Sequence, residues 1–246
     1  MSLLDGIAGA LNFRDVGGMP AGDRVTRSGV LFRSGNLARL TDEGRDVLRG
    51  AGLRRVVDLR DDEEVRFEPS RLDGLDVETV RLPMFAGSAA SFFDEDLSLD
   101  DLYRALIDGA SHRLVEVVRA VAQAQPVLVH CTVGKDRTGV GIALVLAAAG
   151  VEEDAIIADY ALTESRLPAG RNERVLAFLR QRYPEGRHLE DLATRSPAAA
   201  MRRVFDDLRT RYGGPVDFLR AYGLTGDEIA DLRRTLLVPA SSGSDD

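Results

Sequence analysis

The chain contains no tryptophan, one cysteine, one lysine and three histidines among its 246 residues. With Cys131 as the single cysteine, no internal disulfide can form, which fits a reducing compartment. His112, His130 and His188 show no spacing typical of zinc ligands, so we expect neither a metal nor another cofactor. A chain of this length buries about 70–75% of its unfolded surface on folding and needs no such cross-link.

Long hydrophobic runs are also missing. The longest apolar stretch, residues 140–151, has about twelve residues, whereas a helix that spans a bilayer needs about 20. No basic residue precedes the apolar part of residues 1–11, so we expect no Sec signal peptide and take the cytoplasm as the default location, with export by another route left open. The net charge of −8 argues against binding to nucleic acids or anionic membranes.

The order of the expected elements indicates an α/β fold. A strand–helix–strand order predicts a central, mostly parallel sheet flanked by helices, and the fully apolar residues 127–129 suit its central strand. We expect one domain over residues 1–240, with a helical C-terminal part at about 152–237 and a disordered tail at 241–246. Strands are expected at 29–33, 53–59, 77–82 and 127–129, and helices after the N-cap Thr41 up to Gly50 or Gly52, at 61–67, at 99–124 and at 138–149.

The only cysteine and the only lysine lie four positions apart, at Cys131 and Lys135. A codon bias towards arginine would explain the loss of lysine elsewhere but not its retention here. In this segment a buried strand leads into Cys131, five residues follow, and then come Arg137 and the start of a helix. Such a loop points successive backbone N–H groups, here those of residues 132–134, into one concavity that binds a tetrahedral oxyanion.

The residue types in this loop indicate phosphoryl transfer. Cys131 lies at the base of the concavity, where the positive field of the amides favours the thiolate. The planar fork of Arg137 suits two phosphoryl oxygens, so the pair can form a cysteinyl-phosphate intermediate. Thr138 is expected to donate a hydrogen bond to the sulfur. The side chain of His130 points to the other face of the sheet and is expected to support the loop through backbone hydrogen bonds.

Residues 130–139 resemble the HCxxGKDRTG loop of a bacterial family of tyrosine, dual-specificity and phosphoinositide phosphatases. The resemblance extends over nearly the whole chain and implies a phosphatase fold with a helical C-terminal extension. It also implies metal-independent hydrolysis of phosphomonoesters, with phosphotyrosine proteins as the leading substrates and phosphoinositides as the alternative. Further segments that look like landmarks of this family are residues 12–18, 32–35, 57–60 and 159–160.

The resemblance also implies roles for single residues. Cys131 would be the nucleophile and Arg137 the phosphate clamp, while Thr132, Val133 and Gly134 would bind substrate with the rest of the loop. Lys135 would contact substrate as a second cation over the pocket. Asp58 would orient the cations of the loop, although a plain salt bridge to a nearby arginine explains it equally well.

Two places in the sequence offer a candidate for the general acid. Other tyrosine phosphatases supply an aspartate from a separate loop that carries Trp-Pro-Asp, and this chain has no tryptophan. The resemblance favours Asp136, inside the phosphate loop. Asp94 or Asp96, in an acidic stretch ahead of the loop, is the alternative.

Other functions fit the loop less well. It is not a nucleotide-binding P-loop, because Asp136 stands where Ser or Thr should follow the lysine. A cysteine protease would leave Arg137 without a role. A catalytically silent phosphate-binding module and a rhodanese-type sulfur transferase remain as alternatives.

Three simpler interpretations concern charged residues outside the loop. Arg14 and Asp15 are expected to form a structural ion pair or a turn cap, and Arg33 is expected to be solvated. The acidic run 61–64 is expected to start a helix, where the helix dipole favours negative charge.

Overall fold

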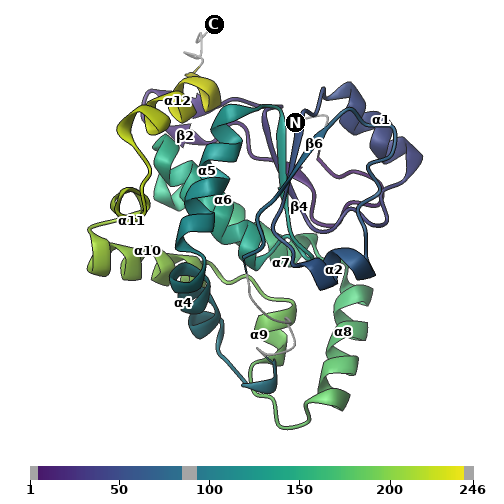
Figure 1. The fold of residues 1–246 in the computed structure, drawn as a ribbon. Helices are drawn as coiled ribbons and strands as arrows, with labels where there is room; N and C mark the ends of the chain where they lie inside the picture. Colours follow the sequence, from purple (N-terminus) through teal and green to yellow (C-terminus); the bar gives the residue numbers. More distant parts are fainter. Residues whose placement is uncertain (1–4, 85–92, 241–246) are drawn as a thin grey trace, which may run out of the picture.

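The computed structural model describes residues 5–84 and 93–240 and has a five-stranded sheet at its centre (Figure 1). In spatial order the strands are β1 (Arg14–Asp15), β4 (Leu31–Ser34), β7 (Val127–His130), β5 (Arg55–Asp58) and β6 (Glu78–Arg81). β1 pairs with β4 in antiparallel fashion, and the remaining strands pair in parallel. The predicted α/β fold with a mostly parallel sheet is therefore confirmed.

The central strand β7 leads into the candidate site. All four of its residues are buried, as its apolar composition predicts. Its register places His130 opposite both Ser34 of β4 and Asp58 of β5. Because Cys131 follows directly, the loop begins at the carboxyl edge of the sheet, where open α/β folds bind their ligands.

The helices agree largely with the sequence patterns. Thr41 caps the first helix, and Asp61 caps the second with both hydrogen bonds of a capping box to Glu64. The described helices are α1 (Asp42–Gly50), α2 (Asp62–Phe67), α4 (Leu99–Gly109), α5 (Ser111–Gln123), α6 (Asp136–Ala149), α7 (Glu153–Arg166), α8 (Ala169–Arg182), α9 (Leu189–Ala193), α10 (Ala198–Tyr212), α11 (Pro215–Ala221) and α12 (Gly226–Leu236).

The prediction of a single helix over 99–124 is wrong, because the chain changes direction between α4 and α5. Ala110, at the junction, has φ −122° and ψ 17°, outside the helical region. Gly109, a weak helix former, precedes it. The apolar spacing continues through the break, because Leu106 and Leu114 on either side are both fully buried. Periodicity alone therefore could not reveal the turn.

A second small sheet was not predicted. It has three antiparallel strands, β2 (Pro20–Ala21), β3 (Arg24–Thr26) and β8 (Leu237–Pro239). β8 lies at the end of the part expected to be helical, and its three residues pair with β3 from the other end of the chain. The predicted tail, 241–246, lies outside the described residues.

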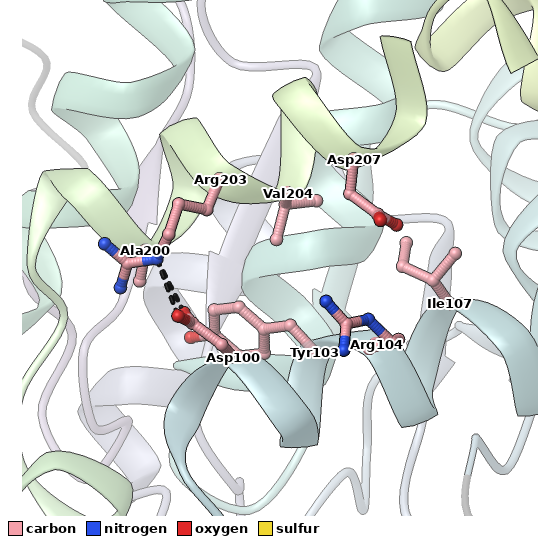
Figure 2. Close-up of a pocket in the computed structure, with 8 residues that line it drawn as sticks. All are labelled: Asp100, Tyr103, Arg104, Ile107, Ala200, Arg203, Val204 and Asp207. Atoms are coloured by element: carbon pink, nitrogen blue, oxygen red, sulfur yellow. Dashed lines mark hydrogen bonds and ion pairs between the residues drawn. The ribbon is translucent and has the colours of Figure 1, made fainter. Parts of the chain in front are cut away.

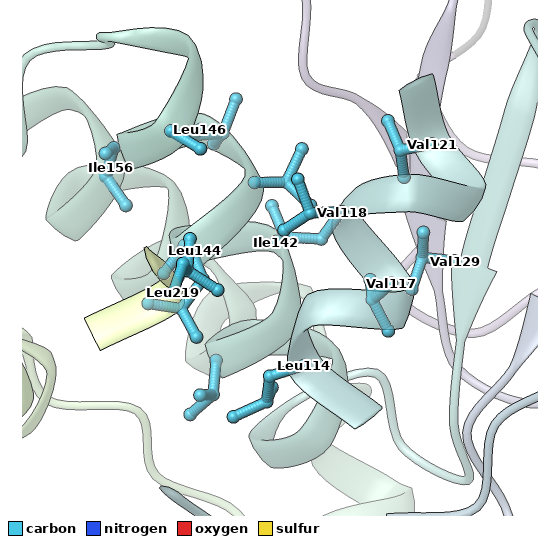
Figure 3. Close-up of a cluster of buried hydrophobic side chains, with 14 of the residues drawn as sticks. Leu114, Val117, Val118, Val121, Val129, Ile142, Leu144, Leu146, Ile156 and Leu219 are labelled. Atoms are coloured by element: carbon cyan, nitrogen blue, oxygen red, sulfur yellow. The ribbon is translucent and has the colours of Figure 1, made fainter. Parts of the chain in front are cut away.

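The larger hydrophobic core lies between the sheet and the helices α5 and α6. Twelve residues of α6 are buried, as its nearly uniform apolar composition predicts. Figure 3 shows α5 and α6 meeting in this core, with side chains from β7, α7 and α11 around them. The side chains labelled there are Leu114, Val117, Val118, Val121, Val129, Ile142, Leu144, Leu146, Ile156 and Leu219.

The opposite face of the sheet is covered by α1 (Figure 1), over a second cluster that includes Phe32, Leu48 and Leu128. α8 and α9 lie apart from both layers, below the sheet in Figure 1, and share a small apolar cluster with Phe93. They thereby form a wall beside the carboxyl edge of the sheet. No helix in the described parts of the chain is long and apolar enough to cross a membrane.

Candidate active site

The loop after β7 and the helices α8 and α9 enclose a cavity of about 310 Å³. Its floor is polar and its walls are mostly apolar. The three residues predicted to be catalytic, Cys131, Asp136 and Arg137, line it together with the predicted binding residues Thr132 and Val133. The complete lining is Glu64, Phe93, Leu102, Cys131, Thr132, Val133, Asp136, Arg137, Arg171, Val175, Phe178, Leu179, Leu192 and Ala193.

Cys131 is buried at the base of the loop, with 3% of its surface exposed. The backbone N–H of Gly134 donates to its Sγ at 3.3 Å. Gly134 has φ +75°, and a Cβ there would lie 2.4 Å from the carbonyl of Ser34. Only glycine fits this turn, which curls the loop over the sulfur.

Arg137 is held in the cavity by Glu64 of α2. Its Nη1 and Nη2 each donate to one Glu64 carboxylate oxygen at 2.6 Å, and Nη2 also donates to Thr132 Oγ1 at 3.2 Å. Burial raises the pKa of Glu64, but the hydrogen bond and charge of Arg137 outweigh it and hold the pKa at about 2. Burial likewise lowers the pKa of Arg137, and the pairing with Glu64 more than reverses that effect. The fork is therefore charged and fixed in one orientation.

Sequence reasoning missed Glu64 as part of the site. The local pattern predicts Glu64 only as an acidic residue at a helix start, and its hydrogen bonds in the capping box of α2 confirm that prediction. Pairing with Arg137, 73 positions later, depends on α2 lying beside the loop at the carboxyl edge of the sheet. Nothing in the local pattern 61–64 carries that information.

Asp136 begins α6, and its carboxylate contacts two neighbours. Tyr103 donates its hydroxyl hydrogen to Asp136 Oδ1 at 3.0 Å, and Lys135 Nζ lies 3.2 Å from the same oxygen. The hydroxyls of Tyr103 and Tyr160 are 2.5 Å apart. Burial, followed by the charge of Asp136, raises the pKa of Tyr103 well above its usual range, so the phenol stays protonated. The carboxylate thus lies in the cavity with one oxygen anchored.

Tyr103 lies between α4 and α10, where it lines a small groove that Figure 2 shows in close-up. Its ring packs there beside Ala200 and Val204, and an ion pair of 2.7 Å between Arg203 and Asp100 closes the groove. At about 70 Å³ the groove is too small for more than a few waters. The groove therefore belongs to the packing around Tyr103 and is not a ligand site of its own.

The alternative acids do not reach the cavity. Asp96 accepts hydrogen bonds from the backbone and side chain of Arg187, at 2.8 Å each, and one from the backbone of His188. Neither Asp94 nor Asp96 is among the residues that line the cavity, although the nearby Phe93 is. Within the described residues, Glu64 and Asp136 are the carboxylates that line the cavity with Cys131, and Glu64 is paired with Arg137.

Lys135 differs from its predicted role. It is only 1% exposed, and its Nζ donates to the backbone carbonyls of Asp191 and Arg195 at 2.8 and 2.9 Å. These carbonyls lie in and just after α9, so the ammonium ties the loop to that helix. Lys135 is not among the residues that line the cavity, whereas the prediction placed it over the pocket.

The side chain of Asp58 pairs with Arg60 instead of orienting the cations of the loop. Its carboxylate accepts from Arg60 Nε and Nη2 at 2.9 and 2.8 Å, so the simpler salt bridge is the one formed. His130 Nε2 lies 3.7 Å from it, and Nδ1 lies 3.3 Å from the carbonyl of Cys131. Burial lowers the pKa of His130 to about 4, so the ring is neutral and contacts the start of the loop from behind, as predicted.

Thr138 does not donate to the sulfur in this structure. It is completely buried, and its Oγ1 has no hydrogen-bond partner within the described parts of the chain. Its predicted bond to Sγ is therefore not formed. The N–H of Gly134 makes that contact instead.

A buried charge network supports the loop from outside. Asp159 of α7 accepts from Arg14 Nε at 2.7 Å and from Arg33 Nη1 at 2.5 Å. Arg33 Nη2 and Asn12 Nδ2 then donate to the carbonyl of Gly134 at 2.9 and 3.0 Å. These bonds fix the peptide between Gly134 and Lys135, and Asn12 Nδ2 also lies 3.5 Å from the carbonyl of Val133, in the peptide that carries the N–H of Gly134.

One of the simpler interpretations is corrected by this network, because Arg33 is 1% exposed rather than solvated. The predicted turn cap is confirmed, since the carboxylate of Asp15 accepts from the backbone N–H groups of Gly17 and Gly29, while Arg14 forms its buried ion pair with Asp159. The partner of both arginines lies more than 120 residues away in the sequence, beyond the reach of local patterns.

Comparison with known proteins agrees with this geometry. A model of the tyrosine phosphatase family matches residues 6–238. The chain is 34% identical to the triple specificity protein phosphatase PtpB of Mycobacterium tuberculosis, over 94% of this chain and 98% of that protein. It is 31% identical to a tyrosine-protein phosphatase of Nostoc commune, over 83% and 73%. Among solved structures, the catalytic domain of the PP-IP phosphatase SIW14 of S. cerevisiae aligns with a TM-score of 0.41 at 15% identity, over 82% of this chain and 95% of that one.

Proposed function

Because the chain belongs to the tyrosine phosphatase family, we propose that it hydrolyses phosphotyrosine and related phosphomonoesters, with Cys131 as nucleophile, Arg137 as phosphate clamp and Asp136 as general acid. The observation that carries this assignment is that the three side chains line one cavity. A buried thiol, a charged guanidinium and a carboxylate in one enclosure are the groups that a two-step phosphoryl transfer requires.

In the first step Cys131 Sγ attacks phosphorus in line with the ester oxygen. The S–P bond forms as the P–O bond breaks, and Asp136 gives its proton to the leaving oxygen. Water then attacks the cysteinyl phosphate while Asp136 takes up a proton, which releases inorganic phosphate and restores the thiolate. No metal ion or cofactor enters this sequence.

The phosphoryl oxygens would be held by the loop and by Arg137. The N–H of Gly134 already points at Sγ, and the amides of Thr132 and Val133 belong to the same loop. Glu64 sets the orientation of the guanidinium before substrate arrives. Negative charge that develops on the phosphoryl group would therefore meet fixed donors, which lowers the barrier because few groups need to reorganise.

The walls of the cavity favour an aromatic phosphate ester. Phe93, Leu102, Phe178 and Leu179 surround the space above Cys131 and offer contacts to a tyrosine ring. The relative from M. tuberculosis is named a triple specificity phosphatase, so the proposal includes other phosphomonoesters, phosphoinositides among them, as further substrates. The proposal keeps the cytoplasm as the compartment, on the basis of the single cysteine.

Hydrolysis of para-nitrophenyl phosphate and of a phosphotyrosine peptide in the presence of EDTA tests the proposal. We expect turnover that EDTA leaves unchanged and that vanadate inhibits. Phosphate binding without turnover would instead identify a catalytically silent binding module. Activity with thiosulfate and none with phosphate esters would identify a sulfur transferase.

A further inference from the structure

A second cavity of about 490 Å³ lies behind one wall of the first. Four residues line both cavities, which means that the two spaces adjoin across a single layer of side chains. The shared residues are Thr132, Val133, Arg171 and Val175. The remaining lining residues of the second cavity are Gly9, Leu11, Asn36, Arg39, Glu68, Pro168 and Arg174.

This second cavity has an excess of positive charge. Arg39, Arg171 and Arg174 line it, and none of the three has a carboxylate within 4.0 Å in the described parts of the chain. Several exposed arginines elsewhere have such partners, as Arg209 has in Glu153 at 2.7 Å. The one acid in the lining, Glu68, accepts a hydrogen bond from Asn36 at 2.5 Å.

Arg171 connects the two cavities. It is half-buried at the start of α8, and its Nη1 donates a hydrogen bond to the amide oxygen of its neighbour Asn172 at 3.0 Å. Burial lowers the pKa of its guanidinium with no acid to offset the effect. A partly desolvated cation without a counter-charge is a binding site for an anion, because pairing recovers what burial costs.

The apolar walls of the first cavity indicate what carries that anion. They suit the ring of a phosphotyrosine, whereas the hydroxyls of a polyol head group would find few polar partners among Leu102, Phe178 and Leu179. When the phosphotyrosine ring occupies the first cavity, the side chain of a neighbouring residue in the same peptide can extend into the second cavity.

We propose that the second cavity, through Arg39, Arg171 and Arg174, binds a second anionic side chain of the substrate. This side chain would be an acidic or phosphorylated residue beside the phosphotyrosine. The inference rests on the proposed function, because it presupposes a phosphotyrosine peptide at Cys131. It adds a determinant of substrate choice that lies outside the phosphate loop.

The test compares kcat/KM for three peptides that differ only beside the phosphotyrosine, with neutral, glutamate or phosphoserine neighbours. The wild-type enzyme should favour the charged peptides by roughly tenfold, the effect of one or two charge-assisted hydrogen bonds, and salt should reduce the preference. The double variant Arg39→Gln/Arg174→Gln should lose most of it. The matched control is Arg180→Gln/Arg182→Gln, which removes the same charge from α8 outside both cavities and should keep the wild-type preference.

Each outcome decides one question. No hydrolysis of any peptide by the wild-type enzyme would overturn the proposed function itself. Hydrolysis of all three peptides at equal rates, or a preference that both double variants lose equally, would refute anion binding in the second cavity. Either result would leave the proposed function in place. A preference for bis-phosphorylated over mono-phosphorylated inositol head groups, with none among the peptides, would overturn the assignment to a peptide.

Discussion

Replacing Glu64 by glutamine tests how the phosphate clamp is held. The variant removes the negative charge that pairs with Arg137 but keeps a side-chain oxygen for the backbone N–H of Asp61, so the capping box of α2 can persist. The change therefore isolates the ion pair from the helix cap. Glu63, the exposed neighbour on the same helix, provides the matched control as Glu63→Gln.

The magnitude follows from the pKa of Glu64, which is lowered from 4.5 to about 2. At about 1.4 kcal/mol per pKa unit this shift corresponds to about 3 kcal/mol of stability. The side chain is 18% exposed, and screening by solvent reduces the expected loss to about 2 kcal/mol. Glu63→Gln should change the free energy of unfolding by less than about 0.5 kcal/mol.

The dependence on pH supplies a second check. Because the pKa of Glu64 is lower in the folded than in the unfolded chain, its charge stabilises the fold fully above about pH 4.5 and loses that effect as the pH falls through about 2. Urea denaturation of wild-type and variant proteins at pH 7 and pH 3 measures the difference. At pH 3 it should be roughly half its value at pH 7 or less. If Glu64→Gln matches Glu63→Gln at pH 7, or if its deficit is the same at both pH values, the ion pair does not hold Arg137 as described.

Four further changes test the site. Cys131→Ser should abolish turnover, below about 10⁻³ of the wild-type kcat, yet still bind phosphate by calorimetry, and any turnover near the wild-type rate would exclude Cys131 as nucleophile. Asp136→Asn should slow alkyl phosphates by about 10²–10⁴ and spare para-nitrophenyl phosphate, whose leaving group needs no proton, whereas equal effects on both would remove the role of acid. Tyr103→Phe, which deletes the hydrogen bond that positions Asp136, should slow alkyl phosphates more than para-nitrophenyl phosphate, while Tyr212→Phe should change neither. Asp159→Asn leaves Arg14 and Arg33 buried without their counter-charge and should cost about 3–5 kcal/mol in urea denaturation, against less than about 0.5 for the exposed Asp206→Asn.

The fold was predictable where local rules and burial act together. Residues 127–129 are apolar without alternation, which only a strand covered on both faces satisfies, and β7 is indeed the central strand. Thr41 and Asp61 cap their helices as their side chains dictate. The break at Ala110 was missed, because apolar residues on both sides of it face the core and the periodicity continues.

The meeting of Cys131 and Arg137 in one cavity was predictable for the same local reason. The distance from Cys131 to Arg137 is set within seven consecutive residues, so their meeting in one cavity needs no long-range information. The side chains of Lys135 and Asp58 turn to α9 and to Arg60, partners that only the tertiary structure defines. The cavity walls from α8 and α9 were beyond prediction too, because amphipathic spacing shows that a helix packs but not against what.

The short N-terminal motifs carry no chemistry of their own, and the structure gives them one common physical task. Asn12 and Arg33 come from two separate motifs, and both donate to the carbonyl of Gly134. Asp159, from the segment 159–160, holds Arg33 in place and also pairs with Arg14, which belongs to the same motif as Asn12. Asn12 Nδ2 also contacts the carbonyl of Val133 at 3.5 Å, which belongs to the same peptide as the Gly134 N–H that donates to the sulfur. The anion-binding concavity is therefore formed by residues spread over most of the chain, which explains why the resemblance extends so far beyond the loop that performs the reaction.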